Sequence, residues 1–279
     1  MLSPDSKRRA INHIIDTLDY SVRRACKIVG MSRSTFLRSK LKQTSSDPDK
    51  KLRADLRDYS ACRPTHGFRR AHAYLTRDVG MEINVKKVQR LWREEGLSRK
   101  TPTKQARKGK RTSPMVKAVR PNHVWSIDFQ FDVTRDGRPV KIASMIDEFT
   151  RESLLDVVER NIDANELARA LTRVFAERGT PEVLRMDNGP EFVSKRLARL
   201  CGDRIGMFFI EPGTPWNNGF VESFNNFRRR ECLRRHDFAN IVEAREIITE
   251  FHRDYNYHHR HSSLGYLTPR EFAQQQVAG

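Results

Sequence analysis

The chain has 279 residues, of which 37% are apolar and 32% are charged. This length accommodates one catalytic domain of ordinary size with smaller modules in front of it. No stretch approaches the roughly 18–20 consecutive apolar residues that a membrane-spanning helix needs, and no apolar secretion segment follows the basic amino terminus. We therefore expect a soluble, cytoplasmic protein and exclude a membrane-embedded or secreted one.

The basic residues are unevenly distributed. The net charge is +20 over residues 1–120 and −2 over residues 121–279, which together make the overall +18. A surplus confined to one end of a chain indicates binding to a polyanion, because each Lys or Arg placed on a phosphate releases condensed counterions. A solubilising or membrane-surface tail is the alternative, but the helical patterns inside the basic part favour DNA.

The four cysteines are scattered, with no Cys-x-x-Cys spacing. A disulfide framework or a structural zinc site would need paired or clustered cysteines. We expect Cys26, Cys62, Cys201 and Cys232 to be unpaired thiols.

Residues 1–45 have the pattern of a helix-turn-helix DNA-binding module. Apolar residues at positions 11, 14, 15 and 18 lie on one face of a helix. A second helix over residues 22–29 ends at Gly30, and Ser32 stands where the amino-terminal cap of a basic helix over residues 33–41 is expected. In such modules the helix after the turn enters the major groove. The candidate DNA contacts on it are Arg33, Arg38 and Lys40.

Residues 46–98 predict a second helical DNA-binding module. Asn84 is a candidate helix cap, and the helix after it ends at Gly96. Its apolar stripe consists of Val85, Val88, Leu91 and Trp92, and we expect Trp92 to pack in a core rather than to stack on a base. The candidate DNA contacts on this helix are Lys86, Lys87 and Arg90.

Residues 99–120 are almost all basic, small or proline. Such a segment buries too little apolar surface to offset the entropy of ordering, so we expect a basic flexible linker. It can order along a phosphate backbone; a passive spacer is the alternative. The candidate DNA contacts in it are Lys108, Lys110 and Arg111.

Residues 121–279 alternate between strand and helix patterns. Strands are predicted over residues 124–132, 140–147, 153–159, 183–186 and 206–210, with helices near residues 167–178, 218–235 and 240–257. Three meandering strands followed by helix, strand, helix, strand and helices is the order of a ribonuclease-H-like fold. We therefore predict an α/β catalytic core with a five-stranded mixed sheet, preceded by the small all-α modules.

Three acidic residues occupy unusual positions in this core. Asp128 lies inside an apolar strand, where an uncompensated charge costs several kcal/mol. Asp187 follows directly after a short strand, and strand ends are where sites in α/β sheets are built. Glu222 lies on a helix that begins near residue 218. In a ribonuclease-H-like topology the first and fourth strands are adjacent and a late helix crosses them, so the three acids should converge.

Three carboxylates in one pocket raise each other's pKa values, and hard cations relieve that repulsion. Two Mg²⁺ ions about 4 Å apart can activate an attacking hydroxyl and stabilise the leaving oxygen of a phosphodiester. The sequence therefore predicts two Mg²⁺ ions at Asp128, Asp187 and Glu222, with Mn²⁺ able to substitute.

Several motifs identify a resemblance that covers residues 21–272. Glu222 follows Asp187 by 35 positions. The segments VWSIDF, RMDNGPEF, TPWNNGFVESFNNFRRRECL and YNYHHRHSSLGYLTPREF, which begin at residues 124, 185, 214 and 255, closely resemble the second reading frame of bacterial insertion-sequence transposases of the integrase-like DDE group. HGFRRAHAYL and NVKKVQRLWREEGL, from residues 66 and 84, are similar to the helical region that precedes the catalytic core in that family.

The resemblance implies that Asp128, Asp187 and Glu222 are the metal-binding catalytic triad. It also implies a basic residue seven positions after the glutamate, which is Arg229 here. Seven residues return to nearly the same helix face, so we expect Glu222, Asn226 and Arg229 to face the active site, with Arg229 holding a phosphate. An ordinary exposed arginine is the alternative.

The resemblance further implies a transposase that binds the terminal inverted repeats of its own element. It would cleave a phosphodiester and join the freed 3′-hydroxyl to target DNA, without ATP or a covalent protein–DNA intermediate. Its partners would be double-stranded DNA, further copies of itself in a dimer or larger synaptic complex, and the protein of the upstream frame. We expect it in the bacterial cytoplasm, associated with the nucleoid.

Two other functions compete with this interpretation. One is a regulator that occupies element ends without catalysis, although the intact triad argues against this. The other is a ribonuclease H acting on RNA–DNA hybrids, which would not need a basic, largely helical segment of some 120 residues before its core.

Other polar residues of the core are given structural roles. We assign turn or surface positions to Asp132, Asp147 and Glu148, and a turn-shaping role to Asn188 and Gly189. The histidines within residues 258–261 suggest a metal site, but a structural or DNA-facing role is the better interpretation.

Removing residues 1–95 should abolish binding to element ends and flatten the dependence of affinity on salt, because most Lys and Arg contacts to phosphate would be lost. Footprinting of end DNA and titrations at several salt concentrations measure both effects. An unchanged footprint from the shortened protein would contradict the DNA-binding role of the basic half.

Overall fold

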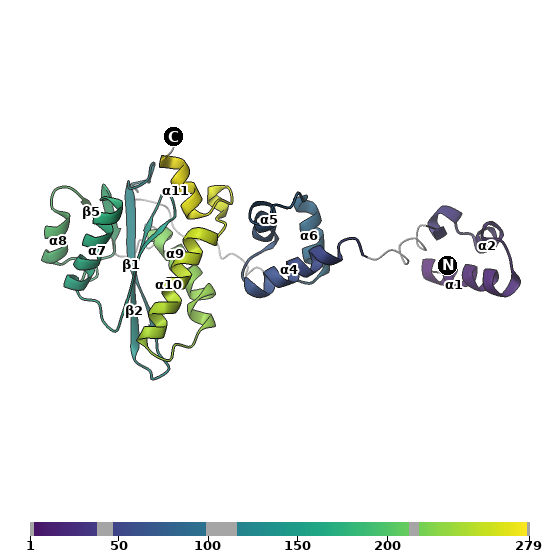
Figure 1. The fold of residues 1–279 in the computed structure, drawn as a ribbon, viewed down its shortest axis with the longest axis horizontal. Helices are drawn as coiled ribbons and strands as arrows, with labels where there is room; N and C mark the ends of the chain where they lie inside the picture. Colours follow the sequence, from purple (N-terminus) through teal and green to yellow (C-terminus); the bar gives the residue numbers. More distant parts are fainter. Residues whose placement is uncertain (1–2, 38–46, 99–115, 212–217, 278–279) are drawn as a thin grey trace. The chain divides into compact units, whose positions relative to one another are not determined.

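The computed structural model describes residues 3–37, 47–98, 116–211 and 218–277. It divides into two compact units, Met1–Asp58 and Tyr59–Gly279 (Figure 1). Within the described ranges, no helix combines the length and the apolar composition needed to cross a bilayer. Five candidate DNA contacts lie outside the described residues: Arg38, Lys40, Lys108, Lys110 and Arg111.

The first unit contains α1 (Pro4–Leu18), α2 (Val22–Val29) and a helix that starts at residue 33. Gly30 ends α2 with a left-handed backbone, φ 67°, which glycine adopts without a steric penalty. The Ser32 hydroxyl accepts a hydrogen bond from the Thr35 amide at 3.1 Å. These observations confirm the predicted helix, glycine turn and capped helix.

A small apolar core joins the elements of this first unit. Ile11, Ala25, Cys26 and Phe36 are buried together. Arg33 is exposed at the start of the third helix. Arg33, which was expected to contact DNA, is therefore exposed and does not belong to this core.

Three helices follow: α4 (Lys50–Cys62), α5 (Phe68–Arg77) and α6 (Val85–Glu94). The Asn84 side chain caps α6 by accepting from the Lys86 amide at 2.8 Å. Val88, Leu91 and Trp92 form its buried stripe, which confirms core packing for Trp92. Val85 does not belong to that stripe, because it is 41% exposed in the first turn of the helix.

A five-stranded sheet forms the centre of the second unit. Its strands are β1 (Val124–Val133), β2 (Pro139–Asp147), β3 (Ser153–Glu159), β4 (Val183–Met186) and β5 (Gly206–Phe209). The strand order is β3-β2-β1-β4-β5, with β1, β2 and β3 antiparallel and β1, β4 and β5 parallel. The predicted mixed sheet and the adjacency of the first and fourth strands are confirmed.

Helices cover both faces of this sheet (Figure 1). On one face, α7 (Ala164–Arg178) and α8 (Lys195–Cys201) enclose a core that includes Trp125 and Ile127. On the other face, α9 (Gly219–Glu231) and α10 (Ile241–His258) enclose a second core with Ile142 and Val221. Because strand side chains alternate between faces, Asp128 lies on the α9 side of β1.

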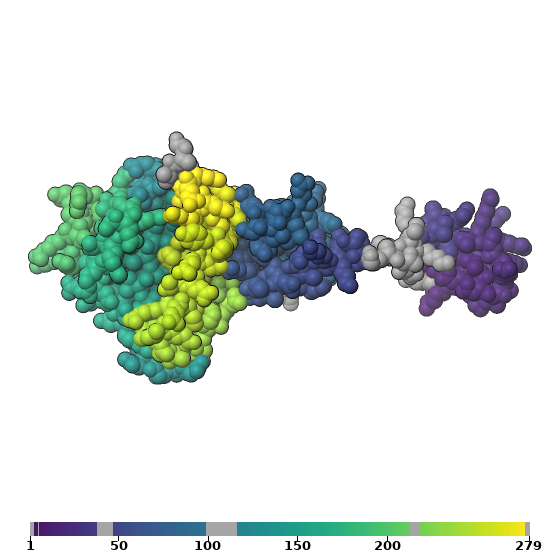
Figure 2. All heavy atoms as spheres, viewed as in Figure 1, coloured from purple at the N-terminus to yellow at the C-terminus, as the bar shows by residue number. Residues whose placement is uncertain are grey.

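The carboxyl-terminal part consists of short 3₁₀ turns at Leu233–Arg235 and Ser262–Leu264 and of α11 (Pro269–Val277). Figure 2 shows α10 and α11, in yellow shades, along one side of the sheet domain. Arg260 is 5% exposed and holds both Asp78, at 2.5 Å, and Glu271, at 2.5 Å. Ion pairs therefore connect the segment after α5 to this part of the second unit.

Two acids that were assigned to turns or the surface are buried. Asp147 accepts hydrogen bonds from the amides of Asn122, Phe149 and Thr150, so it does shape a turn, but inside the protein. Glu148 does lie in a turn, directly after β2, but it is not at the surface: its side chain is fully buried and pairs with Arg185 at 2.6 Å. Sequence alone did not reveal this pair, because Arg185 lies 37 positions away on β4.

Arg185→Ala should lower the free energy of unfolding by about 3–5 kcal/mol, because it leaves Glu148 charged and unpaired in the interior. Urea unfolding followed by circular dichroism measures this loss. Arg135→Ala is the control: it breaks an exposed pair with Asp237 and should cost less than about 1 kcal/mol. Equal losses of unfolding free energy from the two variants would contradict the inference that the buried Arg185–Glu148 pair matters more for stability than an exposed pair.

Candidate active site

Asp128 is held on the central strand by hydrogen bonds from two sides. Its Oδ1 accepts from the Phe129 amide at 2.8 Å, and its Oδ2 accepts from the Asn225 side chain of α9 at 3.0 Å. The carboxylate therefore lies between β1 and α9, in the position that the strand pattern predicted.

Asp187 follows directly after β4, which lies next to β1 and runs parallel to it. The parallel register pairs Ser126 with Arg185, so two further residues along each strand bring Asp128 and Asp187 to the same level. Asp187 Oδ1 accepts from the Gly189 amide at 2.8 Å. A Cβ at Gly189 would lie 3.0 Å from that oxygen, which explains why the turn needs glycine.

Glu222 occupies the first turn of α9 and is half-buried. Asn226 and Arg229 are exposed and lie on the same side of the helix, one and two turns further along. The expected alignment of Glu222, Asn226 and Arg229 is therefore present in the helix, while their contact with DNA stays a prediction.

The three acids act on one another electrostatically. The pKa of Asp128 rises from 3.8 to about 6; burial is the main cause, and the negative charges of Asp187 and Glu222 add to it. Hydrogen bonds from the Phe129 amide and Asn225 oppose the rise. Residues 128, 187 and 222 thus share one field, although 94 positions separate the first from the last.

The chemistry of these donors fits a hard divalent cation. All three side chains offer only carboxylate oxygens, which Mg²⁺ prefers. Desolvation is the main cause of the raised pKa of Asp128, and the charges of Asp187 and Glu222 contribute less. In the described part of the chain, however, no three His, Cys, Asp or Glu side chains are gathered closely enough to form a metal-binding group. Asp128 and Asp187 instead accept hydrogen bonds from the backbone amides of Phe129 and Gly189.

A buried arginine that sequence analysis missed supports Asp128. Arg228 is completely buried on α9; its Nη2 donates to Asn225 Oδ1 at 2.8 Å and its Nε donates to Gln130 Oε1 at 3.0 Å. Arg228 also pairs with Asp156 on β3. Because Asn225 Oδ1 is engaged by Arg228, its amide nitrogen is directed to Asp128.

The helix periodicity could have identified Asn225, which lies three residues after Glu222. Nothing in the run Arg228–Arg230 distinguishes Arg228, the buried member, from its exposed neighbours. The basic residues proposed earlier, Lys86, Lys87 and Arg90 on α6, are exposed, and Arg90 pairs with Glu94 at 2.9 Å.

Of the histidines within residues 258–261, His259 serves packing, whereas His258 is exposed. His259 is 4% exposed, and its ring lies 4.2 Å from that of Phe227. Burial lowers its pKa well below 6.5. The structural interpretation of this histidine is therefore confirmed.

Glu222→Gln should lower the pKa of Asp128 from about 6, because one negative neighbour is removed. Carboxyl NMR titration in a chelator measures it, with Glu250→Gln on the exposed side of α10 as the control. The pKa of Asp128 is higher in the folded protein than in the unfolded chain, so the proton on its carboxyl group stabilises the fold. This contribution, about 1–3 kcal/mol, is fully present below about pH 4 and is lost as the pH rises through 6. An Asp128 pKa near 4 in both proteins would contradict the shared field.

Family models match both the sheet domain and the helical region that precedes it. Family models described as "Integrase core domain" match residues 118–215 and 203–269, and one described as "HTH-like domain" matches residues 48–105. In solved structures, the chain is similar to a simian T-cell lymphotropic virus intasome determined with the PP2A regulatory subunit B56 gamma. The TM-score is 0.50 and the identity 15%, with 72% of this chain and 73% of the other covered. This likeness supports the fold alone.

Sequence relatives are closer. The chain is 37% identical over 270 residues to the insertion element IS407 uncharacterized 31.7 kDa protein of Burkholderia multivorans, with 93% of each covered. It is 35% identical to the insertion element IS476 uncharacterized 39.2 kDa protein of Xanthomonas euvesicatoria, over 98% of this chain and 78% of the relative. The putative transposase InsK of insertion sequence IS150 from Escherichia coli K12 is 29% identical, over 78% of this chain and 80% of the relative.

With an integrase-type catalytic core, a helical DNA-binding region before it and relatives along almost its full length, the chain belongs to the insertion-sequence transposases of the DDE integrase type.

Proposed function

We propose that Asp128, Asp187 and Glu222 are the catalytic carboxylates with which this transposase cleaves and joins DNA strands. The observation that carries the proposal is the pKa of Asp128, raised to about 6 by burial and by its two acidic neighbours. Asp128 and Glu222 are half-buried and Asp187 is exposed. Negative charge on a partly desolvated Asp128 beside two further acids is unfavourable for folding, and DNA phosphates would add to the repulsion. The arrangement is useful if cations neutralise these charges during the reaction.

Two Mg²⁺ ions, with Mn²⁺ as a substitute, are the cations that we propose for these three residues. When bound, they would neutralise the carboxylates and polarise the phosphodiester that is attacked. Asn225 keeps Asp128 in place, and Arg228 keeps the Asn225 amide in the orientation that donates to Asp128. The group that contacts Asp128 is thus the neutral, buried amide of Asn225, while the charge of Arg228 is paired with Asp156.

We propose that the exposed residues Asn226 and Arg229 bind the DNA backbone next to the reacting phosphate. Both follow Glu222 on one side of α9, so a strand lying along that side would meet all three. Arg229 is suited to this because its guanidinium forms paired hydrogen bonds with phosphate oxygens.

Recognition of the terminal inverted repeats is assigned to the amino-terminal half. We propose helix-turn-helix residues 1–45, a second module at residues 46–98, a basic linker at residues 99–120 and the catalytic domain from residue 121 onward. Candidate contacts are Arg33, Lys86, Lys87 and Arg90. The net charge of +20 before residue 121 supports this division.

Transposition brings two element ends together, so we propose that the protein acts as a dimer or larger synaptic complex on DNA. The product of an upstream frame is a further proposed partner. Transposition would take place on the nucleoid in the bacterial cytoplasm.

The test is metal-dependent cleavage and strand transfer on DNA that carries the element's own ends. Asp128→Asn and Glu222→Gln should each lower the rate at least about a hundredfold, because each removes a carboxylate on which cation binding depends. Binding to end DNA, measured by gel shift in a chelator, should be unchanged. Glu250→Gln, an exposed change of the same kind, should retain full activity.

A wild-type protein that binds ends but is inert with Mg²⁺ and Mn²⁺ would favour the regulator instead. Cleavage that persists in Asp128→Asn would remove this residue from the triad.

A further inference from the structure

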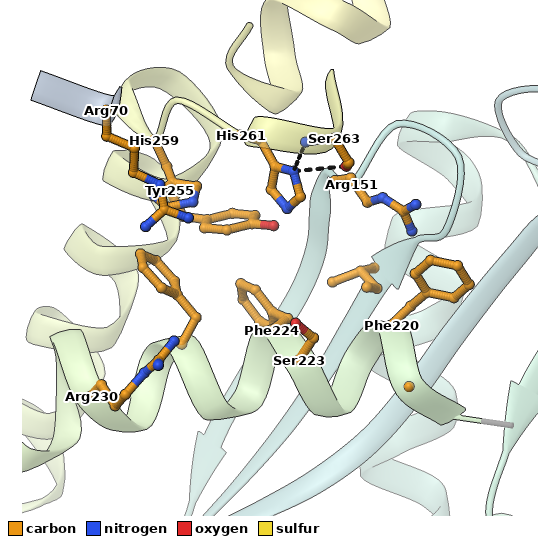
Figure 3. Close-up of a pocket in the computed structure, with 13 residues that line it drawn as sticks. Arg70, Arg151, Phe220, Ser223, Phe224, Arg230, Tyr255, His259, His261 and Ser263 are labelled. Carbon is orange, nitrogen blue, oxygen red and sulfur yellow. Dashed lines mark hydrogen bonds between the residues drawn. The ribbon is translucent and has the colours of Figure 1, made fainter. Parts of the chain in front are cut away.

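A cavity of about 340 Å³ lies beside α9 and contains none of the three candidate catalytic acids. It is bounded by the start of α9, the end of α10 and the segment that follows α10 (Figure 3). Phe224, Phe227 and Tyr255 are buried residues that line it. Its volume is in the range of pockets that hold small organic groups.

The charged groups that line the cavity are all positive. Arg70, Arg151 and Arg230 contribute guanidinium groups, and no Asp or Glu is among the lining residues. His261 also lines it, but burial and the arginines lower its pKa to about 4, so it is neutral at pH 7. The charged side chains on the cavity wall are therefore arginines, a lining that suits an anion. Glu148 and Asp147 act on Arg151, and Glu231 acts on Arg70, so part of this positive charge is offset.

Arg151 is held at the cavity in an unfavourable way. Its backbone is left-handed, φ 64°, which is strained for a residue with a side chain. Its guanidinium lies 4.0 Å above the ring of Phe220, and its Nη1 atom is buried without a hydrogen-bond partner. An unsatisfied buried donor destabilises a protein, so Arg151 is kept at the cavity wall at the expense of stability.

The arrangement of the arginines indicates an extended ligand. In Figure 3, Arg70 and Arg230 lie toward one end and Arg151 toward the other, with Phe224 and Tyr255 between them. Phe220 and Arg230 are ten residues apart on α9, about 15 Å along the helix axis. A single inorganic anion would use one end only and leave the aromatic surface uncovered.

Single-stranded nucleic acid combines the two features that this cavity matches. Its phosphates bind basic groups and its bases stack on aromatic rings, and proteins that hold single strands use both. A duplex cannot enter, because its bases are stacked and paired inside.

We propose that this cavity holds a short unpaired segment of the DNA substrate, with a base against the aromatic side chains and phosphates on Arg70 and Arg230 at one end and on Arg151 at the other. The proposal rests on the assignment of DNA as substrate. It adds a binding site for single-stranded DNA that is separate from the carboxylates.

The probe is a single-stranded oligonucleotide of about six thymidines with one 5-iodouracil, added to the full chain. Irradiation should cross-link it to aromatic residues of the cavity, identified by mass spectrometry. In fluorescence anisotropy, Arg70→Gln with Arg151→Gln should weaken binding about tenfold or more. Arg173→Gln, which removes an exposed arginine of α7, should weaken it less than about twofold.

A second variant fills the cavity without removing charge. Ser223 is exposed on α9 and lines the cavity, so Ser223→Trp should fold normally and block the oligonucleotide. Asp128→Asn should bind the oligonucleotide like the wild type while losing cleavage, so failure of the carboxylate proposal and failure of this one give different results.

Three outcomes would overturn the proposal. The first is cross-linking only outside the cavity, or unchanged binding by both sets of variants. The second is displacement by thymidine monophosphate as effective as by the oligonucleotide, which would indicate a free nucleotide. The third is occupation of the cavity by a polyglutamate peptide but not by the oligonucleotide, which would indicate an acidic protein partner.

Discussion

The negative charge of Asp128, placed in the middle of the sheet's central strand, determines much of the surrounding structure. Burial and two acidic neighbours raise its pKa to about 6. The protein does not neutralise this charge with a direct ion pair. It supplies neutral hydrogen bonds from the Phe129 amide and from Asn225 instead. The carboxylate therefore keeps a high affinity for protons and, by the same argument, for cations.

Two buried arginines near Asp128 and Asp187, Arg228 and Arg185, form ion pairs with other residues. Arg228 pairs with Asp156 and bonds Gln130 and Asn225, so it links β1, β3 and α9 in one buried network. Burial alone would raise the pKa of Asp156, but Arg228 and His252 hold it below its ordinary value. Arg185, two residues before Asp187, is likewise paired with Glu148. Positive charge stabilises the scaffold in this way without neutralising the proposed catalytic acids.

Helix α9 separates two environments with opposite charge. Glu222 on one side belongs to the acidic cluster, whereas Phe220, Phe224 and Arg230 line a basic and aromatic cavity. A DNA substrate offers a reacting phosphate to the first and, by our proposal, a short unpaired segment to the second. One helix would then position the strand on both sides of its axis.

Local sequence patterns predicted most helices and strands and singled out Asp128, Asp187 and Glu222 as candidate site residues. Alternating apolar residues gave the strand that contains Asp128, the short strand before Asp187 was recognisable by its length, and Ser32 and Asn84 cap the helices that they were expected to cap. These features depend on neighbours within a few positions, which a sequence displays directly.

Only the tertiary structure decided which polar residues are buried and what they contact. Arg228 looks like Arg229 and Arg230 in sequence, and Glu148 looks like a turn residue, yet both are buried in ion pairs with partners 72 and 37 positions away. The cavity likewise combines Arg70, Arg151 and Arg230 from three distant segments. Pairing across such separations follows from how the sheet and helices pack, and local sequence patterns carry no record of it.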